Sequence, residues 1–314
     1  MRFLHILIIL ILGINNFYAQ IIKNTDSSAV FIENDTLKNT LPISELNTSF
    51  KFRPFDGEDI NTPILIGVSA AAIGVGISVH LYNYNAWWKN DRSSKFRILN
   101  DWNYALWIDK VGHFYGTAIE AHGLSAALDA ANVPPEETAI ISSVGAFLFQ
   151  TFIEIEDGYG AQWGFSPGDF AADFLGASYH LAKYYFPAVR NFQPRVSYYP
   201  SEDYRTGKHK DGNISDDYEG QKYWLSLRMK ELLPKSVSKY WPSFLMLSAG
   251  MGVKNLDGSG GGTREIFISF DIDWQEIPIP GKFGQFVKNT LNYFHLPLPG
   301  LKISPKAAFL VFCY

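Results

Sequence analysis

Two segments of the chain carry the same pattern of residues that could take part in chemistry. The chain reads DKVGHFYG at 109–116 and DFAADFLG at 169–176. In both segments an Asp is followed, after three intervening residues, by His or Asp and then by Phe, any residue and Gly. A histidine among carboxylates can transfer protons or bind a hard divalent cation. These two segments are therefore the first candidates for a functional site.

Helical spacing would place the polar residues of both segments in stripes. Steps of three and four residues keep side chains on one side of a helix. The first segment follows such steps at Asp109, His113, Gly116 and Glu120, and the second at Asp169, Asp173, Gly176 and His180. On the segment between them, Gln150 and Glu154 are four residues apart. The sequence thus predicts three neighbouring apolar helices, each with one polar stripe.

These three stripes are expected to face one another. A buried carboxylate without a partner is costly, so the stripes are most stable when they share one polar centre. Gly116 and Gly176 would let the helix backbones approach closely. Within the centre, His113, Glu154 and Asp173 are the candidates for catalysis. The predicted members of the centre are Asp109, His113, Glu120, Gln150, Glu154, Asp169, Asp173 and His180.

Simpler roles stay open for two of these residues. SPGD at 166–169 is typical of a helix start, with Ser166 as N-cap and Asp169 in the capping-box position. His113 could equally be a neutral core histidine that bonds to a carboxylate. Asp173 and Glu154 are harder to explain in this way, because each lies in an apolar helical context. The histidines at 80, 122, 209 and 295 have no such company and are expected to be incidental.

The start of the chain predicts export. MRFLHILIILILGINNFYAQ has a positive residue, an apolar run and a small residue before Gln20, so residues 1–19 are interpreted as a signal peptide. The alternative, a short membrane anchor, needs a longer run, since a span takes about 20 apolar residues. The single cysteine, Cys313, can form no internal disulfide and does not lie at the predicted cleavage site. We therefore expect an exported protein without an N-terminal lipid.

Composition favours a membrane-associated chain and excludes nucleic acid as a partner. Only 18% of residues are charged, against roughly 25% in typical soluble domains. The net charge is −4, and the sequence contains no basic block. Residues 62–82 are apolar, with small residues at helical spacing, and are about long enough to cross a membrane. A buried helix of a soluble core is the alternative for this stretch, with Thr62 expected as its N-cap.

The polarity pattern divides the chain into five parts. After the signal peptide, residues 20–61 form a mobile polar segment, and residues 62–190 form a helical, membrane-associated domain with both motifs. Its further helices are expected at about 105–131, 136–156 and 168–187. Residues 200–221 are a polar linker, and residues 222–314 are strand-rich. The predicted fold class is α+β, with an N-terminal apolar bundle of about four to five helices followed by an antiparallel strand-rich region with one helix.

The strand prediction rests on alternating residues. REIFISFDIDW, at 264–274, places Ile266, Ile268, Phe270, Ile272 and Trp274 on one face. The other face has Glu265, Ser269, Asp271 and Asp273, with Phe267 as the exception. Further strands are expected at 222–230, 243–253 and 305–314, with a helix at about 282–294. Four strands are too few to close a membrane barrel, which takes about eight. The sheet is therefore expected to face water, a partner or the helical domain.

The motif region resembles two known families. NDWNYALWIDKVGHFYG and FIEIEDGYGAQWGFSPGDFAADFLGA, at 100–116 and 152–177, are similar to the YfiM-like family of uncharacterised bacterial envelope proteins, in the longer form found in Bacteroidetes. That resemblance implies an envelope location and no particular reaction. The chain is less similar to VanZ-like membrane proteins, and this likeness implies a helical core embedded in a membrane. It rests on Asp109, Lys110, His113, Phe114, Glu154, Asp169 or Asp173, and Gly176.

Three classes of function fit these observations. The first is an envelope protein, in the outer membrane or on the periplasmic side of a membrane, with a structural or assembly role. The alternative is a hydrolase or metal-binding protein that acts on a lipid-linked substrate through His113, Glu154, Asp169 and Asp173. The third is a small-molecule or lipid binder. The sequence contains no G-x-S-x-G, H-E-x-x-H or phosphate loop, so the first class is favoured. No cofactor is predicted beyond a candidate divalent metal, and the expected partners are membrane lipid and other envelope proteins.

Overall fold

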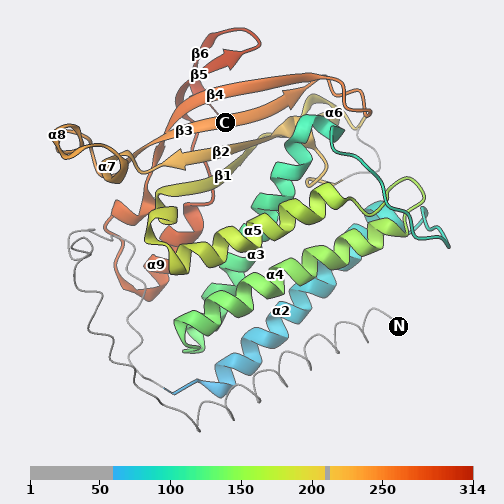
Figure 1. The fold of residues 1–314 in the computed structure, drawn as a ribbon, viewed down its shortest axis with the longest axis horizontal. Helices are drawn as coiled ribbons and strands as arrows, with labels where there is room; N and C mark the ends of the chain where they lie inside the picture. Colours follow the sequence, from blue (N-terminus) through green and yellow to red (C-terminus); the bar gives the residue numbers. More distant parts are fainter. Residues whose placement is uncertain (1–58, 209–212, 314) are drawn as a thin grey trace, which may run out of the picture. The chain divides into compact units, whose positions relative to one another are not determined.

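Four long helices form the first part of the chain in the computed structural model, which describes residues 59–208 and 213–313. They are α2 (Thr62–Asn83), α3 (Ile108–Ala130), α4 (Pro135–Gly158) and α5 (Pro167–Tyr185), with the short helices η2 (Tyr84–Trp88) and η3 (Tyr104–Trp107) between the first two (Figure 1). The predicted signal peptide, nearly all of the predicted mobile segment and His209 lie outside the described residues.

The helices begin where the sequence offers capping groups. Ser166 Oγ accepts a hydrogen bond of 3.1 Å from the backbone N–H of Asp169, at the start of α5. Helix α2 is capped by Asn61, whose side chain accepts a 3.1 Å bond from the N–H of Ile64. The prediction of Thr62 as this N-cap was therefore wrong by one residue. The carboxamide of Asn61 extends forward to the first turn, and Thr62 is already helical.

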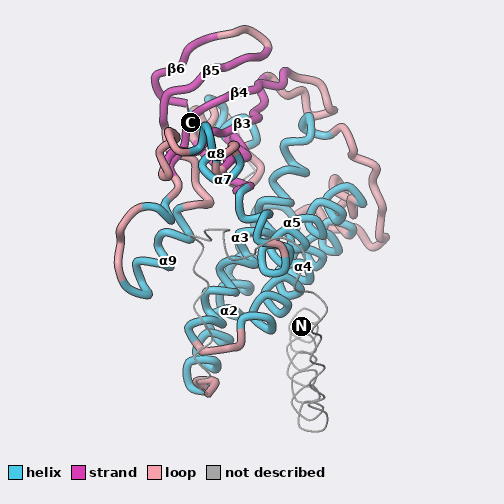
Figure 2. The backbone as a smooth tube through the Cα atoms, turned by 60° about the vertical axis from the view of Figure 1, so that its left-hand side comes forward, coloured by secondary structure: helices cyan, strands magenta, loops and turns pink. Residues whose placement is uncertain are grey.

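Helix α3 is the centre of the helical part. It packs against α4 and α5, and it also contacts β1, β2 and β3. Helix α2 packs against the far end of α3, where Leu65 and Val68 meet Leu128 and Ala131. Figure 2 accordingly shows the strands on one side of α3 and helices on the other.

Two helical segments, Thr62–Trp88 and Pro135–Gly158, have the length and composition to cross a membrane. None of the most apolar stretch of the first is buried, whereas 39% of that in the second is. Ile66 and Val75 of α2 are more than half exposed. Only the second segment therefore has a large part of its apolar surface covered by the protein itself.

The second part of the chain is a six-stranded antiparallel sheet with strand order β1 to β6, so the predicted α+β class is confirmed. The strands are β1 (Phe192–Tyr198), β2 (Gln221–Leu227), β3 (Leu245–Lys254), β4 (Thr263–Ile272), β5 (Leu298–Ser304) and β6 (Ala308–Cys313). The predicted helix near 282–294 is α9 (Gly281–Leu291). Short helices connect these elements: η4 (Pro187–Asn191), α6 (Glu202–Arg205), η5 (Tyr218–Gly220), α7 (Met229–Leu232), α8 (Lys235–Ser238) and η6 (Trp274–Glu276).

The sheet begins earlier than the sequence indicated. β1 starts at Phe192, before the stretch at 200–221 that was interpreted as a linker between domains. That stretch instead connects β1 to its neighbour β2. β5 was also not predicted, and β2 ends at Leu227 rather than near 230. The free edge of β1 is covered by the segment after α9, because Val196 N donates to Tyr293 O at 3.0 Å and His295 N donates to Val196 O at 2.9 Å.

The two faces of the sheet differ in polarity, and in β4 the more polar face is the buried one. In β4, Phe267, Ser269 and Asp271 are buried, whereas Ile268 and Phe270 are exposed. The alternation predicted for this strand is therefore present, but its mainly polar side is the one that faces inward. The apolar side is covered by α3 only near one end, where Val253 packs with Ile108 and Ala105.

Candidate functional site

The polar stripes of α3, α4 and α5 converge on the imidazole of His113. Its Nδ1 atom lies 3.2 Å from Oδ1 of Asp173 on α5. Its Nε2 atom lies 3.8 Å from Oε1 of Glu154 on α4 and 3.9 Å from Oδ1 of Asp109, one turn earlier on α3. One ring therefore contacts carboxylates from three helices, which is the shared polar centre that the stripes predicted.

A second cation, Lys110, lies beside His113 at the start of α3. Its Nζ atom is 2.7 Å from Asp101, 3.1 Å from Asp169 and 3.4 Å from Asp109. Asp101 belongs to the segment before η3, and Asp169 belongs to the first turn of α5. The buried ammonium group thus joins three separate parts of the chain.

Neutral donors complete the surroundings of the carboxylates. The backbone N–H of Ser166 donates to Glu154 Oε2 at 2.9 Å, and Thr117 Oγ1 donates to Asp173 Oδ1 at 2.8 Å. Tyr218, from the connection between β1 and β2, donates to Asp109 Oδ1 at 2.7 Å. Through Tyr218 the centre is tied to the sheet as well as to the helices.

Of the two roles proposed for Asp169, the structure supports the one in the polar centre. Its backbone N–H caps α5 through Ser166, and its carboxylate contacts Lys110. The side chain does not reach back over the cap as a capping box would require, because the ammonium group is a stronger partner for a buried carboxylate.

Burial and charge act in opposite directions on the groups of this centre. Burial alone would lower the pKa of His113, but the nearby carboxylates, Asp173 above all, hold that pKa well above its usual value. Burial would likewise lower the pKa of Lys110, and the charges of Asp109 and Asp169 raise it instead. Burial, together with the charge of Asp109, raises the pKa of Asp169 to about 7. The ring of His113 is therefore best described as an imidazolium held by carboxylates.

Three predicted members lie at or beyond the edge of the centre. Gln150 Nε2 donates to Glu120 Oε1 at 2.7 Å, and burial raises the pKa of Glu120 to about 8. His180 is buried near Lys183 and His122. Burial lowers the pKa of His180 most, and the charges of Lys183 and His122 lower it further. His180 lies two helical turns, about 10 Å, beyond Asp173, so its stripe extends past the centre.

The two motif glycines differ in their surroundings. A Cβ atom on Gly176 would collide with the carbonyl oxygen of Phe114 and lie 3.0 Å from Cβ of Thr117. A Cβ atom on Gly116 would come no closer than 3.9 Å, to Gln150. The close approach of α3 and α5 is therefore located at Gly176, not at Gly116.

The sheet holds a second buried ionic cluster that the sequence analysis missed. Arg195 Nη1 donates to Asp271 Oδ1 at 3.0 Å, and His295 Nδ1 lies 2.6 Å from Asp271 Oδ2. Trp224 stacks on the ring of His295, with centroids 3.8 Å apart. The expectation that His295 is incidental was wrong, and Asp271 on the polar side of β4 was the available signal.

Two sets of residues in the helical centre have the donor atoms of a metal site. The ligand atoms of Asp109, His113 and Asp169, and those of His113, Glu154 and Asp173, lie within 4.8 Å of one another in each set. Lys110 already supplies a cation to Asp109 and Asp169, so the first set fits a metal poorly. The second set fits better, because Asp173 Oδ2 is buried without a hydrogen-bond partner. Its oxygen-rich composition suits a hard cation better than zinc.

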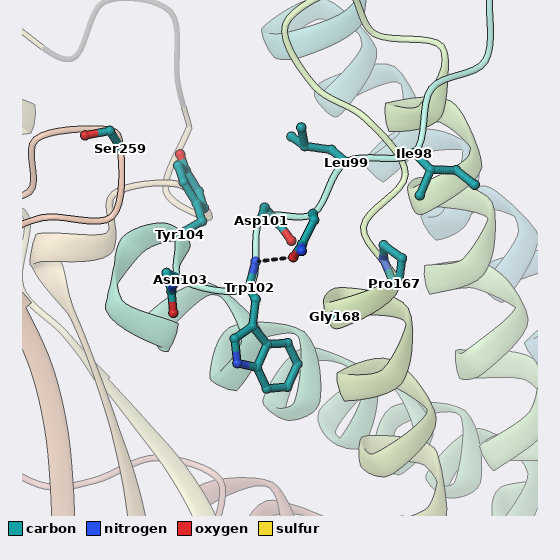
Figure 3. A pocket seen from close by; sticks show the side chains of 10 residues that line it. Ile98, Leu99, Asp101, Trp102, Asn103, Tyr104, Pro167, Gly168 and Ser259 are labelled. Atoms are coloured by element: carbon teal, nitrogen blue, oxygen red, sulfur yellow. Dashed lines mark hydrogen bonds between the residues drawn. The ribbon is translucent and has the colours of Figure 1, made fainter.

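A cleft lies outside the centre, on the side of Asp101. It has a volume of about 890 Å³ and is lined by residues 98–104, Pro167, Gly168 and Ser259. Figure 3 shows Ser259, from the loop between β3 and β4, opposite Pro167 and Gly168 at the start of α5. Asp101 lines this cleft and also contacts Lys110. Its carboxylate therefore lies between the cleft and the buried centre.

The fold and the site define an α+β protein in which a helical domain with a buried ionic centre is joined to an antiparallel sheet. Residues 99–185, which contain His113, Lys110 and the five carboxylates around them, match a family described as predicted periplasmic lipoprotein (DUF2279). No curated protein and no solved structure matches the chain. The family match supports an exported protein of an uncharacterised bacterial envelope family.

Proposed function

We propose that this chain is a structural or assembly protein of the cell envelope, and that its polar centre fixes the positions of α3, α4 and α5. The observation that carries this proposal is the set of contacts made by Lys110 and His113. Together they contact carboxylates from three helices and from the segment before η3. Such a centre specifies one arrangement of helices, since any shift leaves a buried charge without its partner.

We further propose that the helical domain is membrane-associated, with lipid and other envelope proteins as partners. Support comes from α2, which is apolar, long enough to cross a bilayer and largely uncovered by the rest of the described chain. Export through the predicted signal peptide at 1–19 would bring this helix to the envelope. A location in the outer membrane or on the periplasmic side of a membrane is consistent with the family match.

The structural role is tested by replacing Lys110, which leaves the oxygen atoms of Asp101, Asp109 and Asp169 without a cation. We expect Lys110→Met to lower the free energy of unfolding by about 3–5 kcal/mol. The matched control is Lys208→Met, because Lys208 and Asp203 form an ion pair 3.5 Å apart with both side chains about two-thirds exposed. That change should alter the free energy of unfolding by less than about 1 kcal/mol. Equal, small effects of both substitutions on urea unfolding in detergent would refute the proposed role.

A second candidate function is metal binding, with hydrolysis of a lipid-linked substrate as its consequence. One specific observation favours it: the unpartnered Oδ2 of Asp173 lies in the set formed by His113 and Glu154. Titration of the purified protein with Mn²⁺ tests it through the melting temperature, since a bound ion stabilises the folded state. If this candidate is correct, the melting temperature of wild type rises with Mn²⁺ to a plateau. The melting temperature of Glu154→Gln does not change, and that of Glu120→Gln rises as in wild type. If none of the three proteins responds, the candidate fails.

A further inference from the structure

The exposed side of the sheet carries a continuous apolar row that crosses five strands. The strand register places Leu225, Ala249, Ile268, Leu301 and Phe309 beside one another, from β2 to β6. The four larger side chains of this row are between 39% and 67% exposed. Phe270, next to Ile268 on the same side of β4, is exposed as well. We call these six residues the outer face of the sheet: Leu225, Ala249, Ile268, Phe270, Leu301 and Phe309.

The opposite side of the same strands is buried and mixed, with an ionic and hydroxyl cluster beside the apolar residues Trp224 and Phe267. Arg195 and Asp271 are fully buried there, and the hydroxyls of Ser226 and Ser248 lie 2.7 Å apart. A sheet in water is expected to turn its apolar side inward and its polar side outward. Strands that lie in a membrane show the reverse pattern, with apolar side chains outside and polar side chains inside. The sheet of this protein has the second pattern.

The dimensions of the strands match those of a bilayer. β3 and β4 have ten residues each, which corresponds to about 33 Å of extended chain. The hydrocarbon core of a bilayer is about 30 Å thick. At the end of the sheet where β1 leads into β2, Trp87 of η2 donates to Asp216 at 3.1 Å, which joins the segment after α2 to the connection between these strands.

Both ends of the sheet carry the residues that favour a membrane interface. At the end near η3, Trp102 and Trp107 are exposed and stack edge to face at 5.0 Å, and Arg264 donates to the carbonyl of Leu106 at 2.9 Å. At the other end Lys239 lies 4.7 Å from the ring of the exposed Tyr240. Tryptophan and tyrosine beside basic side chains are typical of the headgroup region.

We propose that the outer face of the sheet lies against the acyl chains of a lipid bilayer. The inference rests on the proposed envelope location and adds the sheet to the membrane-contacting surface. A lipid phase is favoured over a single protein partner because exposed apolar side chains lie on α2 as well as on the sheet. One partner covers one patch, whereas a bilayer covers every apolar surface between its two interfaces.

The test uses the full chain in vesicles of phosphatidylethanolamine and phosphatidylglycerol, with a polarity-sensitive fluorophore on one introduced cysteine. Ile268→Cys and Leu301→Cys probe the outer face independently, so that misfolding of one variant leaves the other. Val75→Cys probes α2, and Asp203→Cys is an exposed polar control on α6. Wild type, in which Cys313 is buried, gives the labelling baseline. The quencher is bromine on the lipid acyl chains.

If the sheet faces lipid, brominated lipid causes loss of most of the fluorescence at 268 and 301, and little loss at 203. Quenching at 75 without quenching at 268 and 301 would overturn the inference while leaving α2 in the membrane. In that case cross-linking between two copies through residue 268 would show that a second chain covers the face. No quenching at any position would overturn the inference together with the proposed membrane association. None of these outcomes bears on the structural role of the polar centre, which the Lys110 variants test separately.

Discussion

His113 and Asp173 join two helices at the middle of the buried ionic centre, with Nδ1 of the ring 3.2 Å from Oδ1 of the carboxylate. The carboxylate has no exposed surface, and it also accepts a bond from Thr117. This pair lies where α3 and α5 approach most closely, one turn from Gly176. Charge pairing and backbone packing therefore act on the same pair of helices.

The packing of these helices predicts different effects for the two motif glycines. Gly176→Ala forces a methyl group against the carbonyl of Phe114, so we expect a loss of about 1–3 kcal/mol or more in the free energy of unfolding. Gly116→Ala has room for its methyl group and should be neutral or stabilising by up to about 1 kcal/mol, since alanine favours helix. Denaturant titrations of both variants in detergent measure the difference. A Gly176→Ala protein as stable as Gly116→Ala would show that the helices do not approach here as described.

The ionic cluster of the sheet is expected to be as important for stability as that of the helices. Arg195→Met leaves Asp271 buried without its guanidinium, and we expect a loss of about 3–5 kcal/mol in the free energy of unfolding. Arg205→Met is the matched control, because Arg205 is exposed and only approaches the ring of Tyr199 at 5.3 Å. Its loss should be about 0.5–1 kcal/mol. Equal thermal stability of the two variants would mean that Arg195 is not buried against Asp271.

The pKa of His113 predicts a specific dependence of stability on pH. The folded-state pKa is well above the ordinary value of 6.5, so the folded protein keeps a proton that the unfolded chain loses. The stabilising contribution of His113 is therefore fully present below pH 6.5 and is lost as pH rises through the folded-state value. The difference in unfolding free energy between wild type and His113→Gln should shrink as pH rises from about 6 to about 9.

A second histidine provides the control for this pH dependence. Burial, followed by the charge of Lys183, lowers the pKa of His122 to about 3, so this ring is neutral when folded throughout that range. His122→Gln should leave the pH dependence above 6.5 unchanged. A difference between wild type and His113→Gln that is constant with pH would contradict the assignment of His113 as an imidazolium.

The helices and their shared centre were predictable because both follow from spacing. Steps of three and four residues placed Asp109, His113, Glu154 and Asp173 on stripes, and the energetic penalty for a buried charge implied that the stripes meet. Asp101 was not predictable in this way. It lies in an irregular segment, where residue spacing does not determine which way a side chain points. Lys110 follows Asp109 directly and lies off the stripe, yet its long side chain reaches the same carboxylates.

The sheet was predicted only in part, for identifiable reasons. β1 contains Pro194, and β5 contains Pro299 and Gly300, and these residues weaken the usual strand signal. Alternation in β4 showed that two faces exist but not which one faces the protein. The inward position of Asp271 depends on Arg195 and His295, which are distant in sequence, so local pattern could not reveal it.

The central claim is that the charges around His113 hold the helices together rather than perform a reaction, and Asp173→Asn tests it most directly. The measurement is the amount of the variant in the envelope fraction, by immunoblot, beside a growth or envelope-integrity phenotype, with Asp203→Asn as the exposed control. We predict that abundance and function fall together for Asp173→Asn and that both stay normal for Asp203→Asn. Normal abundance of Asp173→Asn with complete loss of function would contradict the structural role and favour a catalytic or metal-binding centre.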